Sequence, residues 1–278
     1  MELSVEFFPP RSQEQRVVLA ETRKQLLPYD PAYYSVTFGA GGSTLDATLD
    51  TVREIHKEDS ICVAPHLSCM GGKEESIIEL LDAYKDAGIR RLLALRGDMP
   101  SGMMPWGYFR HANELVQFVR QETGEHFHIS VACYPEVHPE AETAKSDFKF
   151  FKQKVEAGAD SAITQFFFNP ESYFYFVDRC EKEGIDIPII PGIMPISNYS
   201  QLNRFAQTCG SDMPRWLAKR LQDFGDDRAS IQEFGTEVIS KLCERLIEQG
   251  VPGLHIYTLN RSKTTLKVFE NLGIEKVK

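Results

Sequence analysis

Short apolar runs alternate along the chain with longer stretches in which apolar residues recur at helical spacing. Eight of the short runs have the length and composition of buried β-strands, and they span residues 3–7, 33–37, 61–66, 91–96, 128–134, 161–165, 187–193 and 254–259. The stretches between them carry helical signals. One of them, 143–157, has an apolar stripe at helical spacing that consists of Ala144, Phe148, Phe151 and Val155.

Strands and helices that alternate in this way predict a (β/α)₈ barrel, the TIM-barrel fold, within the α/β class. The interval between the seventh and eighth strands is longer than the others, which predicts an extra helix around residues 213–224. The alternative is an open, doubly wound sheet. That fold typically carries a glycine-rich motif after its first strand, whereas residues 8–10 here are FPP. We therefore expect a single catalytic barrel domain over residues 1–278, without a regulatory domain.

Composition narrows the class of protein. The chain has 278 residues, 42% of them hydrophobic and 26% charged, and a net charge of −9. Without a cluster of Lys and Arg, nucleic acid is not an expected partner. No apolar stretch approaches the length of a membrane span, so no membrane contact is expected. The six cysteines are scattered and form no CxxC pair, which is typical of a reduced, cytoplasmic protein without a disulfide or metal framework.

The active site of such a barrel lies at the C-terminal ends of its strands. The predicted ends carry Glu6, Thr37, His66, Arg96, Gly97, Asp98, Tyr134, Gln165, Asn260 and Arg261, and all of these except Gly97 are polar. A polar side chain at the end of a buried strand costs free energy unless it is paired or used. The strand ends are therefore the candidate site.

Glu6 is the candidate general acid. It lies between Val5 and Phe7, and an apolar setting raises the pKa of a carboxyl towards neutrality. The alternative is a salt bridge from Glu6 to a neighbouring residue such as Arg96. The histidines are too far apart in sequence to suggest a metal site, so none is expected.

Six motifs, taken together and in this order, resemble those of bacterial methylenetetrahydrofolate reductases. They are SVEFFPPR at 4–11, VTFGAGG at 36–42, ALRGD at 94–98, YPEVHP at 134–139, ITQFFF at 163–168 and YTLNR at 257–261. The resemblance covers residues 3–273, nearly the whole chain.

The resemblance implies a flavoprotein oxidoreductase that reduces 5,10-methylenetetrahydrofolate to 5-methyltetrahydrofolate for methionine synthesis. NADH or NADPH would supply electrons in a ping-pong reaction through non-covalently bound FAD, and the sequence does not distinguish the two nucleotides. By the same resemblance, Glu6 is the general acid that protonates N10 of the folate. Asp98 is a catalytic carboxylate near the flavin and the pterin. A homo-oligomer is also expected.

The remaining site residues follow from the same resemblance. The positions that match the cofactor site are Thr37 for the nicotinamide nucleotide and, for FAD, Phe38, Ala40, His66, Arg96, Gly97, Asp98, Ala112, Tyr134, His138, Ala141, Asp147 and Lys154. Those that match the folate site are Asp98, Gln165, Gln201, Phe205 and Arg261. Phe150 and Gln153 stand at two positions that are polar in the family. Because Phe150 cannot donate a hydrogen bond, contact there must use backbone or packing.

Three other functions are weighed against this one. Another barrel flavoenzyme, such as a proline-dehydrogenase-like oxidase, would be reduced by its amine substrate rather than by NADH. A cofactor-free lyase or aldolase would need a Schiff-base lysine or a metal cluster at the strand ends, and neither is found. A non-catalytic binding module would be colourless and would gain nothing from a buried Glu6.

Overall fold

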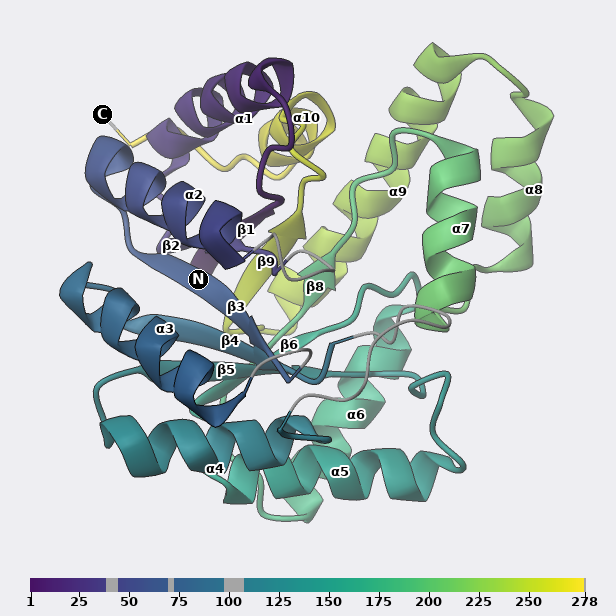
Figure 1. The fold of residues 1–278 in the computed structure, drawn as a ribbon. Helices are drawn as coiled ribbons and strands as arrows, with labels where there is room; N and C mark the ends of the chain where they lie inside the picture. Colours follow the sequence, from purple (N-terminus) through teal and green to yellow (C-terminus); the bar gives the residue numbers. More distant parts are fainter. Residues whose placement is uncertain (39–44, 70–72, 98–107, 278) are drawn as a thin grey trace.

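The computed structural model describes residues 1–277 except 39–44, 70–72 and 98–107. Its described strands form one parallel sheet in the order β7-β6-β5-β4-β3-β2-β1-β9-β8. The strands are β1 Glu2–Phe7, β2 Tyr33–Val36, β3 Val63–Ser68, β4 Arg91–Leu95, β5 His128–Cys133, β6 Ser161–Thr164, β7 Ile189–Ile190, β8 Gly192–Ile193 and β9 Gly253–Tyr257. The sheet curves into a nearly closed barrel with helices around it, so the predicted (β/α)₈ fold is confirmed (Figure 1).

The predicted seventh strand is split at Pro191 into β7 and β8. Proline has no backbone N–H, so it cannot continue a ladder of hydrogen bonds. β7 pairs with β6, β8 pairs with β9, and the Pro191 carbonyl accepts the N–H of His255. Gly192 has no room for a side chain, because a Cβ there would lie 2.2 Å from the Thr164 carbonyl oxygen. The two short pieces therefore join β6 to β9 and close the barrel.

The helices surround the barrel, with one group standing beyond it. They are α1 Gln13–Leu26, α2 Leu45–Asp59, α3 Glu74–Asp86, α4 Ala112–Thr123, α5 Ala144–Glu156, α6 Pro170–Lys182, α7 Tyr199–Cys209, α8 Arg215–Asp223, α9 Arg228–Glu248 and α10 Lys263–Asn271, with a short 3₁₀ helix at Leu27–Tyr29. α8 is the predicted extra helix, and it follows α7 between β8 and β9 (Figure 1). None of the described helices is long and apolar enough to cross a membrane.

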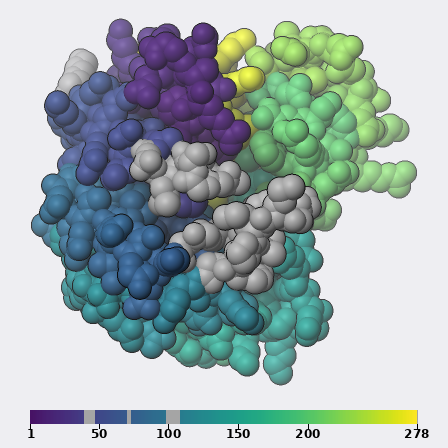
Figure 2. All heavy atoms as spheres, viewed as in Figure 1, coloured from purple at the N-terminus to yellow at the C-terminus, as the bar shows by residue number. Residues whose placement is uncertain are grey.

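The two ends of the chain pack together on one side of the barrel. The Thr22 hydroxyl of α1 donates to the backbone carbonyl of Asn260, and Ser262, just before α10, donates to Gln25. The purple N-terminal and yellow C-terminal segments are accordingly neighbours in Figures 1 and 2. This contact holds β1 and β9 side by side, and both strands contribute to the site below.

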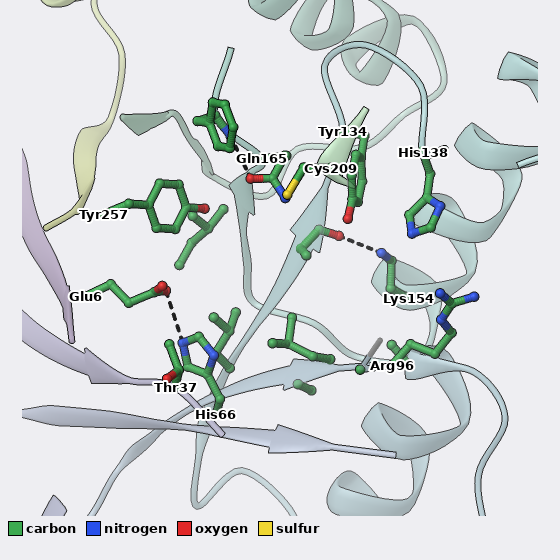
Figure 3. A pocket seen from close by; sticks show the side chains of 18 of the residues that line it. Glu6, Thr37, His66, Arg96, Tyr134, His138, Lys154, Gln165, Cys209 and Tyr257 are labelled. Atoms are coloured by element: carbon green, nitrogen blue, oxygen red, sulfur yellow. Dashed lines mark hydrogen bonds and ion pairs between the residues drawn. The ribbon is translucent and has the colours of Figure 1, made fainter. Parts of the chain in front are cut away.

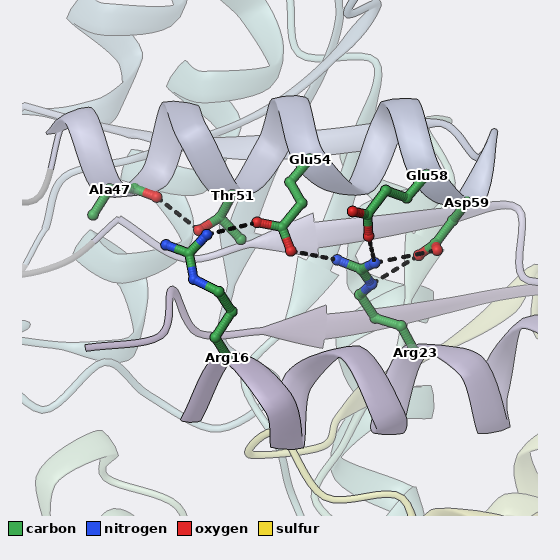
Figure 4. A network of polar contacts seen from close by, with 7 residues as sticks. All are labelled: Arg16, Arg23, Ala47, Thr51, Glu54, Glu58 and Asp59. Atoms are coloured by element: carbon green, nitrogen blue, oxygen red, sulfur yellow. Dashed lines mark hydrogen bonds and ion pairs between the residues drawn. The ribbon is translucent and has the colours of Figure 1, made fainter. Parts of the chain in front are cut away.

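A buried arginine joins α1 to α2 (Figure 4). Arg23 is only 2% exposed, and its guanidinium lies 2.7 Å from Glu58 Oε2, 2.9 Å from Asp59 Oδ2 and 3.5 Å from Glu54 Oε1. Glu54 also pairs with the exposed Arg16 at 3.0 Å. A buried charge is tolerated only when it is paired in this way. The network therefore fixes the first two helices relative to each other.

Side chains along β1 alternate between the helices and the barrel interior. Phe7 points outward and packs edge-on against Tyr34, with ring centroids 5.0 Å apart. Ser4 points inward and contacts His255 of the neighbouring strand β9 inside the barrel. Barrel interiors are usually filled with Val, Ile and Leu. This one also holds buried polar side chains, namely Ser4, Ser35, Ser130, Ser161 and His255.

Candidate active site

A cavity of about 520 Å³ opens at the C-terminal ends of the strands. It brings together most of the residues predicted to form the site. Those that line it are Glu6, Thr37, His66, Arg96, Gly97, Ala112, Tyr134, His138, Ala141, Asp147, Lys154, Gln165 and Phe205. Residues far apart in sequence therefore meet around one pocket (Figure 3).

Five predicted site residues are not among the lining residues. Phe38, Gln201 and Arg261 are described but lie outside the lining of this pocket. Arg261 is exposed, and Gln201 lies in the first turn of α7. Ala40 and Asp98 lie outside the described residues.

Glu6 lies at the floor of the pocket, where β1 ends. Its side chain is 12% exposed, and its Oε2 atom is 3.2 Å from His66 Nε2 (Figure 3). The same atom lies 3.4 Å from His255 Nε2. Burial by itself raises the pKa of the carboxyl, but the charge of His66 and hydrogen bonds from both imidazoles outweigh it. The result is a pKa lowered to about 2, so Glu6 is ionised near neutral pH.

This environment corrects two expectations from the sequence. The expected rise in the pKa of Glu6 is wrong, because Val5 and Phe7 point to the opposite face of the strand and two histidines take their place. The alternative of a salt bridge is confirmed in kind but with other partners: Glu6 contacts His66 and His255, whereas Arg96 Nη1 lies 2.7 Å from Glu140 Oε2.

β9 contributes two inward-facing residues that the sequence did not single out. His255 is fully buried, and its Nδ1 atom lies 2.7 Å from Ser4 Oγ. Tyr257 donates its hydroxyl to the Thr164 carbonyl, and burial raises its pKa well above 10, so it stays neutral. The signal that could have found both is the two-residue period of the strand, which places 255 and 257 on the same face.

The segment after β9 fixes the end of β1. The Thr258 hydroxyl donates to the backbone carbonyl of Glu6 at 2.7 Å. The Asn260 side chain accepts the N–H of Phe8 and donates to its carbonyl, at 2.8 and 2.9 Å. Asn260 takes a left-handed backbone conformation with φ 56°, which asparagine tolerates better than most residues. These bonds hold the Glu6 side chain at a set depth in the pocket.

The opposite wall carries a partly buried cation and two aromatic rings in contact. Lys154 donates to the Ala132 carbonyl, and burial lowers the pKa of its ammonium group. Asp147 accepts the backbone N–H of His138. The rings of Tyr134 and His138 lie 4.6 Å apart (Figure 3). This wall suits a ligand that is both aromatic and anionic.

The rim of the pocket carries an aromatic pair. The rings of His111 and Phe150 stack 5.3 Å apart at an angle of 20°, and both residues line the pocket. Phe150 is 45% exposed, so it is not needed to fill the core. Within the described part of the chain, no cluster of three or more His, Cys, Asp or Glu could hold a metal ion.

Comparisons with known proteins assign the chain to a family. The model of the methylenetetrahydrofolate reductase family matches residues 1–273. The chain is 39% identical to 5,10-methylenetetrahydrofolate reductase of Escherichia coli K12, over 98% of this chain and 90% of the relative. It is 37% identical to methylenetetrahydrofolate reductase (NADH) 1 of Arabidopsis thaliana, over 98% of this chain and 48% of that relative.

A solved structure shows the same fold at low sequence identity. It is a protein of Clostridium thermocellum that binds two copies of 5-methyl-5,6,7,8-tetrahydrofolic acid, with a TM-score of 0.65 and 14% identity over 99% of this chain and 94% of that one. The family assignment rests on the sequence matches, which span nearly the whole chain. The chain therefore belongs to the methylenetetrahydrofolate reductase family.

Proposed function

We propose that the protein reduces 5,10-methylenetetrahydrofolate to 5-methyltetrahydrofolate with NADH or NADPH, in a ping-pong reaction through non-covalent FAD. Its product would supply methyl groups for methionine synthesis. The observation that carries the proposal is Glu6. A buried, ionised carboxylate at the floor of a pocket, in contact with two imidazoles, is a site prepared for proton transfer.

The residues of the pocket fit a flavin dinucleotide. The partly buried Lys154 and the partly exposed Arg96 offer positive charge to a pyrophosphate. The His111–Phe150 pair offers a flat surface on which an adenine ring can stack. A volume of about 520 Å³ lies within the range of cofactor and ligand sites.

The bound FAD would accept hydride from the nicotinamide nucleotide and pass it to the methylene carbon of the folate. The role of Glu6 is to deliver a proton to N10. As the bond between N10 and the methylene carbon breaks, its electron pair stays on N10 and takes up that proton. Glu6 is ionised before the folate binds, and a folate that excludes water from the floor raises the pKa of the carboxyl.

Other residues would orient the folate. Gln165 and Phe205 line the pocket, and the Gln165 amide can donate to and accept from the edge of a pterin. Asp98 is proposed as an anion that stabilises the cationic iminium form of the opened ring. Gln201 and Arg261 are proposed for the outer part of the folate, since neither lines the pocket itself.

The proposal is tested first by the visible spectrum of the purified protein. We expect a flavin spectrum, release of FAD by acid or heat, bleaching by NADH or NADPH without oxygen, and recovery of the colour on addition of methylenetetrahydrofolate. Initial rates should give parallel lines in double-reciprocal plots. Proline, which would reduce a proline-dehydrogenase-like enzyme, should not bleach the protein. A reduced flavin that methylenetetrahydrofolate does not reoxidise would overturn the proposal.

A further inference from the structure

A line of buried polar groups leads away from Glu6 into the barrel. Glu6 Oε2 faces His255 Nε2 at 3.4 Å, and the other ring nitrogen, Nδ1, lies 2.7 Å from Ser4 Oγ. Both Ser4 and His255 are almost fully buried. Which nitrogen of a neutral His255 carries the hydrogen therefore depends on whether Ser4 donates to Nδ1 or accepts from it.

Tyr33 stands beyond Ser4, below the floor of the pocket. Its ring stacks on His255 with centroids 6.2 Å apart, and it is 1% exposed. Its hydroxyl is buried without an aligned hydrogen-bond partner among the described residues, although the Ser4 hydroxyl is near enough to influence its pKa by hydrogen bonding. Burial raises the pKa of Tyr33 to about 12, so the phenol keeps its proton.

A buried O–H group needs an acceptor, because leaving it unpaired costs free energy. The Ser4 hydroxyl acts on Tyr33 by hydrogen bonding, and its oxygen can accept the phenol hydrogen. When Ser4 accepts from Tyr33, its own hydrogen is directed to Nδ1 of His255. The hydrogen of the neutral imidazole then lies on Nε2, where it points at Glu6.

We propose that Tyr33 is a positioning residue for Glu6: acting through Ser4, it holds His255 in the tautomer that donates Nε2–H to the carboxylate. The proposal deepens the proposed function, on which it rests. The donated hydrogen bond stabilises the ionised carboxylate. In the opposite tautomer, Nε2 carries no hydrogen. Its lone pair would repel the Glu6 carboxylate and would accept a hydrogen bond from Glu6 in its protonated form. Tyr33 thereby influences the pH at which Glu6 carries the proton for N10.

Among the described residues, few titratable side chains act on Glu6, so the hydrogen bond from His255 has a large effect on its pKa. The titratable side chains that act on Glu6 from the described elements are His66 of β3, His255 and Tyr257 of β9, and Tyr33 of β2. Tyr257 donates its hydrogen to Thr164 and so does not donate to Glu6. His66 lines the pocket, where a ligand can displace it. His255 lies below the pocket, so its bond to Glu6 can persist when ligand is bound.

Tyr33→Phe tests the proposal, because it removes the hydroxyl and keeps the ring. Tyr34→Phe is the matched control: Tyr34 is the next residue of β2, is equally buried, and donates its hydroxyl to the Arg23 carbonyl on the outer face. Ser4→Ala breaks the same line of bonds one step later and should reproduce the effect of Tyr33→Phe. The double variant should add nothing further, since both changes act through His255.

The first measurement is the tautomer of His255, read by long-range ¹H–¹⁵N correlation in histidine-labelled holoprotein. We expect hydrogen on Nε2 in the wild type and in Tyr34→Phe, and a loss of that preference in Tyr33→Phe and Ser4→Ala. Hydrogen on Nδ1 in the wild type, or an imidazolium, would overturn the proposal whatever the enzyme's activity.

The second measurement is the pH profile of flavin reoxidation by methylenetetrahydrofolate. A general acid works only while protonated, so its rate falls as pH rises through its pKa. Losing a hydrogen bond to a charged group should move this fall upward by about one pH unit in Tyr33→Phe and Ser4→Ala. Reduction by NADH should be unchanged. A merely structural role would lower both rates and the melting temperature without moving the profile, and that result would overturn the proposal.

Failure of the wild type to react with methylenetetrahydrofolate would instead contradict the proposed function, and the tautomer measurement would still stand.

Discussion

Glu6 Oε2 and His66 Nε2 lie 3.2 Å apart across the floor of the pocket, which places a carboxylate from the end of β1 against an imidazole from β3. His66 is 5% exposed, so the pair is largely shielded from water. At such a shielded site, the interactions with His66 favour the charged form of the carboxyl far more strongly than an exposed partner would. The pKa of Glu6 is therefore set by contacts between strands.

Glu6→Gln should separate the two half-reactions. The variant keeps the size of the side chain and loses the proton donor. We expect FAD binding and reduction by NADH to stay near the wild-type rate, and reoxidation by methylenetetrahydrofolate to fall by about 10²- to 10⁴-fold. Stopped-flow absorbance of each half-reaction measures this. Glu2→Gln, at the other end of β1, is the control and should change neither rate. Normal folate turnover in Glu6→Gln would remove Glu6 from the mechanism.

The lowered pKa of Glu6 predicts a pH-dependent stability. The folded-state pKa is about 2 against an ordinary value of 4.5, so the unfolded chain binds the proton more readily. The stabilisation is therefore complete above pH 4.5 and is lost as pH falls towards 2. Its size is roughly 3 kcal/mol. Denaturant unfolding of wild type and Glu6→Gln at several pH values should show a difference that shrinks over this range. A difference that stays constant from pH 6 to pH 2.5 would contradict the assigned pKa.

Phe150→Ala should weaken the hold on FAD. The change removes one ring of the His111–Phe150 stack at the rim and leaves the core intact, since Phe150 is 45% exposed. An aromatic stack contributes about 1 kcal/mol, so the Kd for FAD should rise roughly 5-fold. Quenching of FAD fluorescence during reconstitution measures it. Trp216→Ala, an exposed aromatic on α8 outside the pocket, should leave the Kd unchanged. Equal effects of the two changes would argue against stacking at Phe150.

Arg23→Ala should destabilise the fold much more than Arg16→Ala. Removing Arg23 takes away the counter-charge of the largely buried Asp59, and one partner each from Glu54 and Glu58, which should cost about 3 kcal/mol. Arg16 is half exposed and, among the described residues, pairs only with Glu54, so its loss should cost less than about 1 kcal/mol. Chemical denaturation of both variants compares them. Similar losses would show that the buried arginine has no special role in joining α1 to α2.

The fold was largely predictable because its signals are local. Short apolar runs and helical patterns mark strands and helices within a few residues of each position, and the alternation of the two implies the barrel. The break at Pro191 could also be read from the chemistry of proline. The seventh strand was nonetheless expected to be continuous, because only the pairing of β7 with β6 and of β8 with β9 shows that each half meets a different neighbour.

The candidate site was predictable in part. Inward-facing polar residues at strand ends, among them Glu6, His66 and Gln165, do line one pocket. Gln201 and Arg261 do not, because their positions depend on how α7 and the segment after β9 pack. His255 and Ser4 were missed, since a buried histidine or serine within a strand resembles an ordinary core residue until its partner is known.

The sequence by itself determined the alternation of strands and helices, the barrel that follows from this alternation, and the family motifs that the chain carries. Only the tertiary structure decided the chemistry of Glu6. Sequence neighbours suggested an apolar environment, yet the groups that set its pKa come from β3 and from β9, the latter 249 residues away in the chain. Electrostatic interactions depend on distance through space, and adjacent residues of a strand point to opposite faces. The charge of this carboxylate therefore follows from the closure of the barrel.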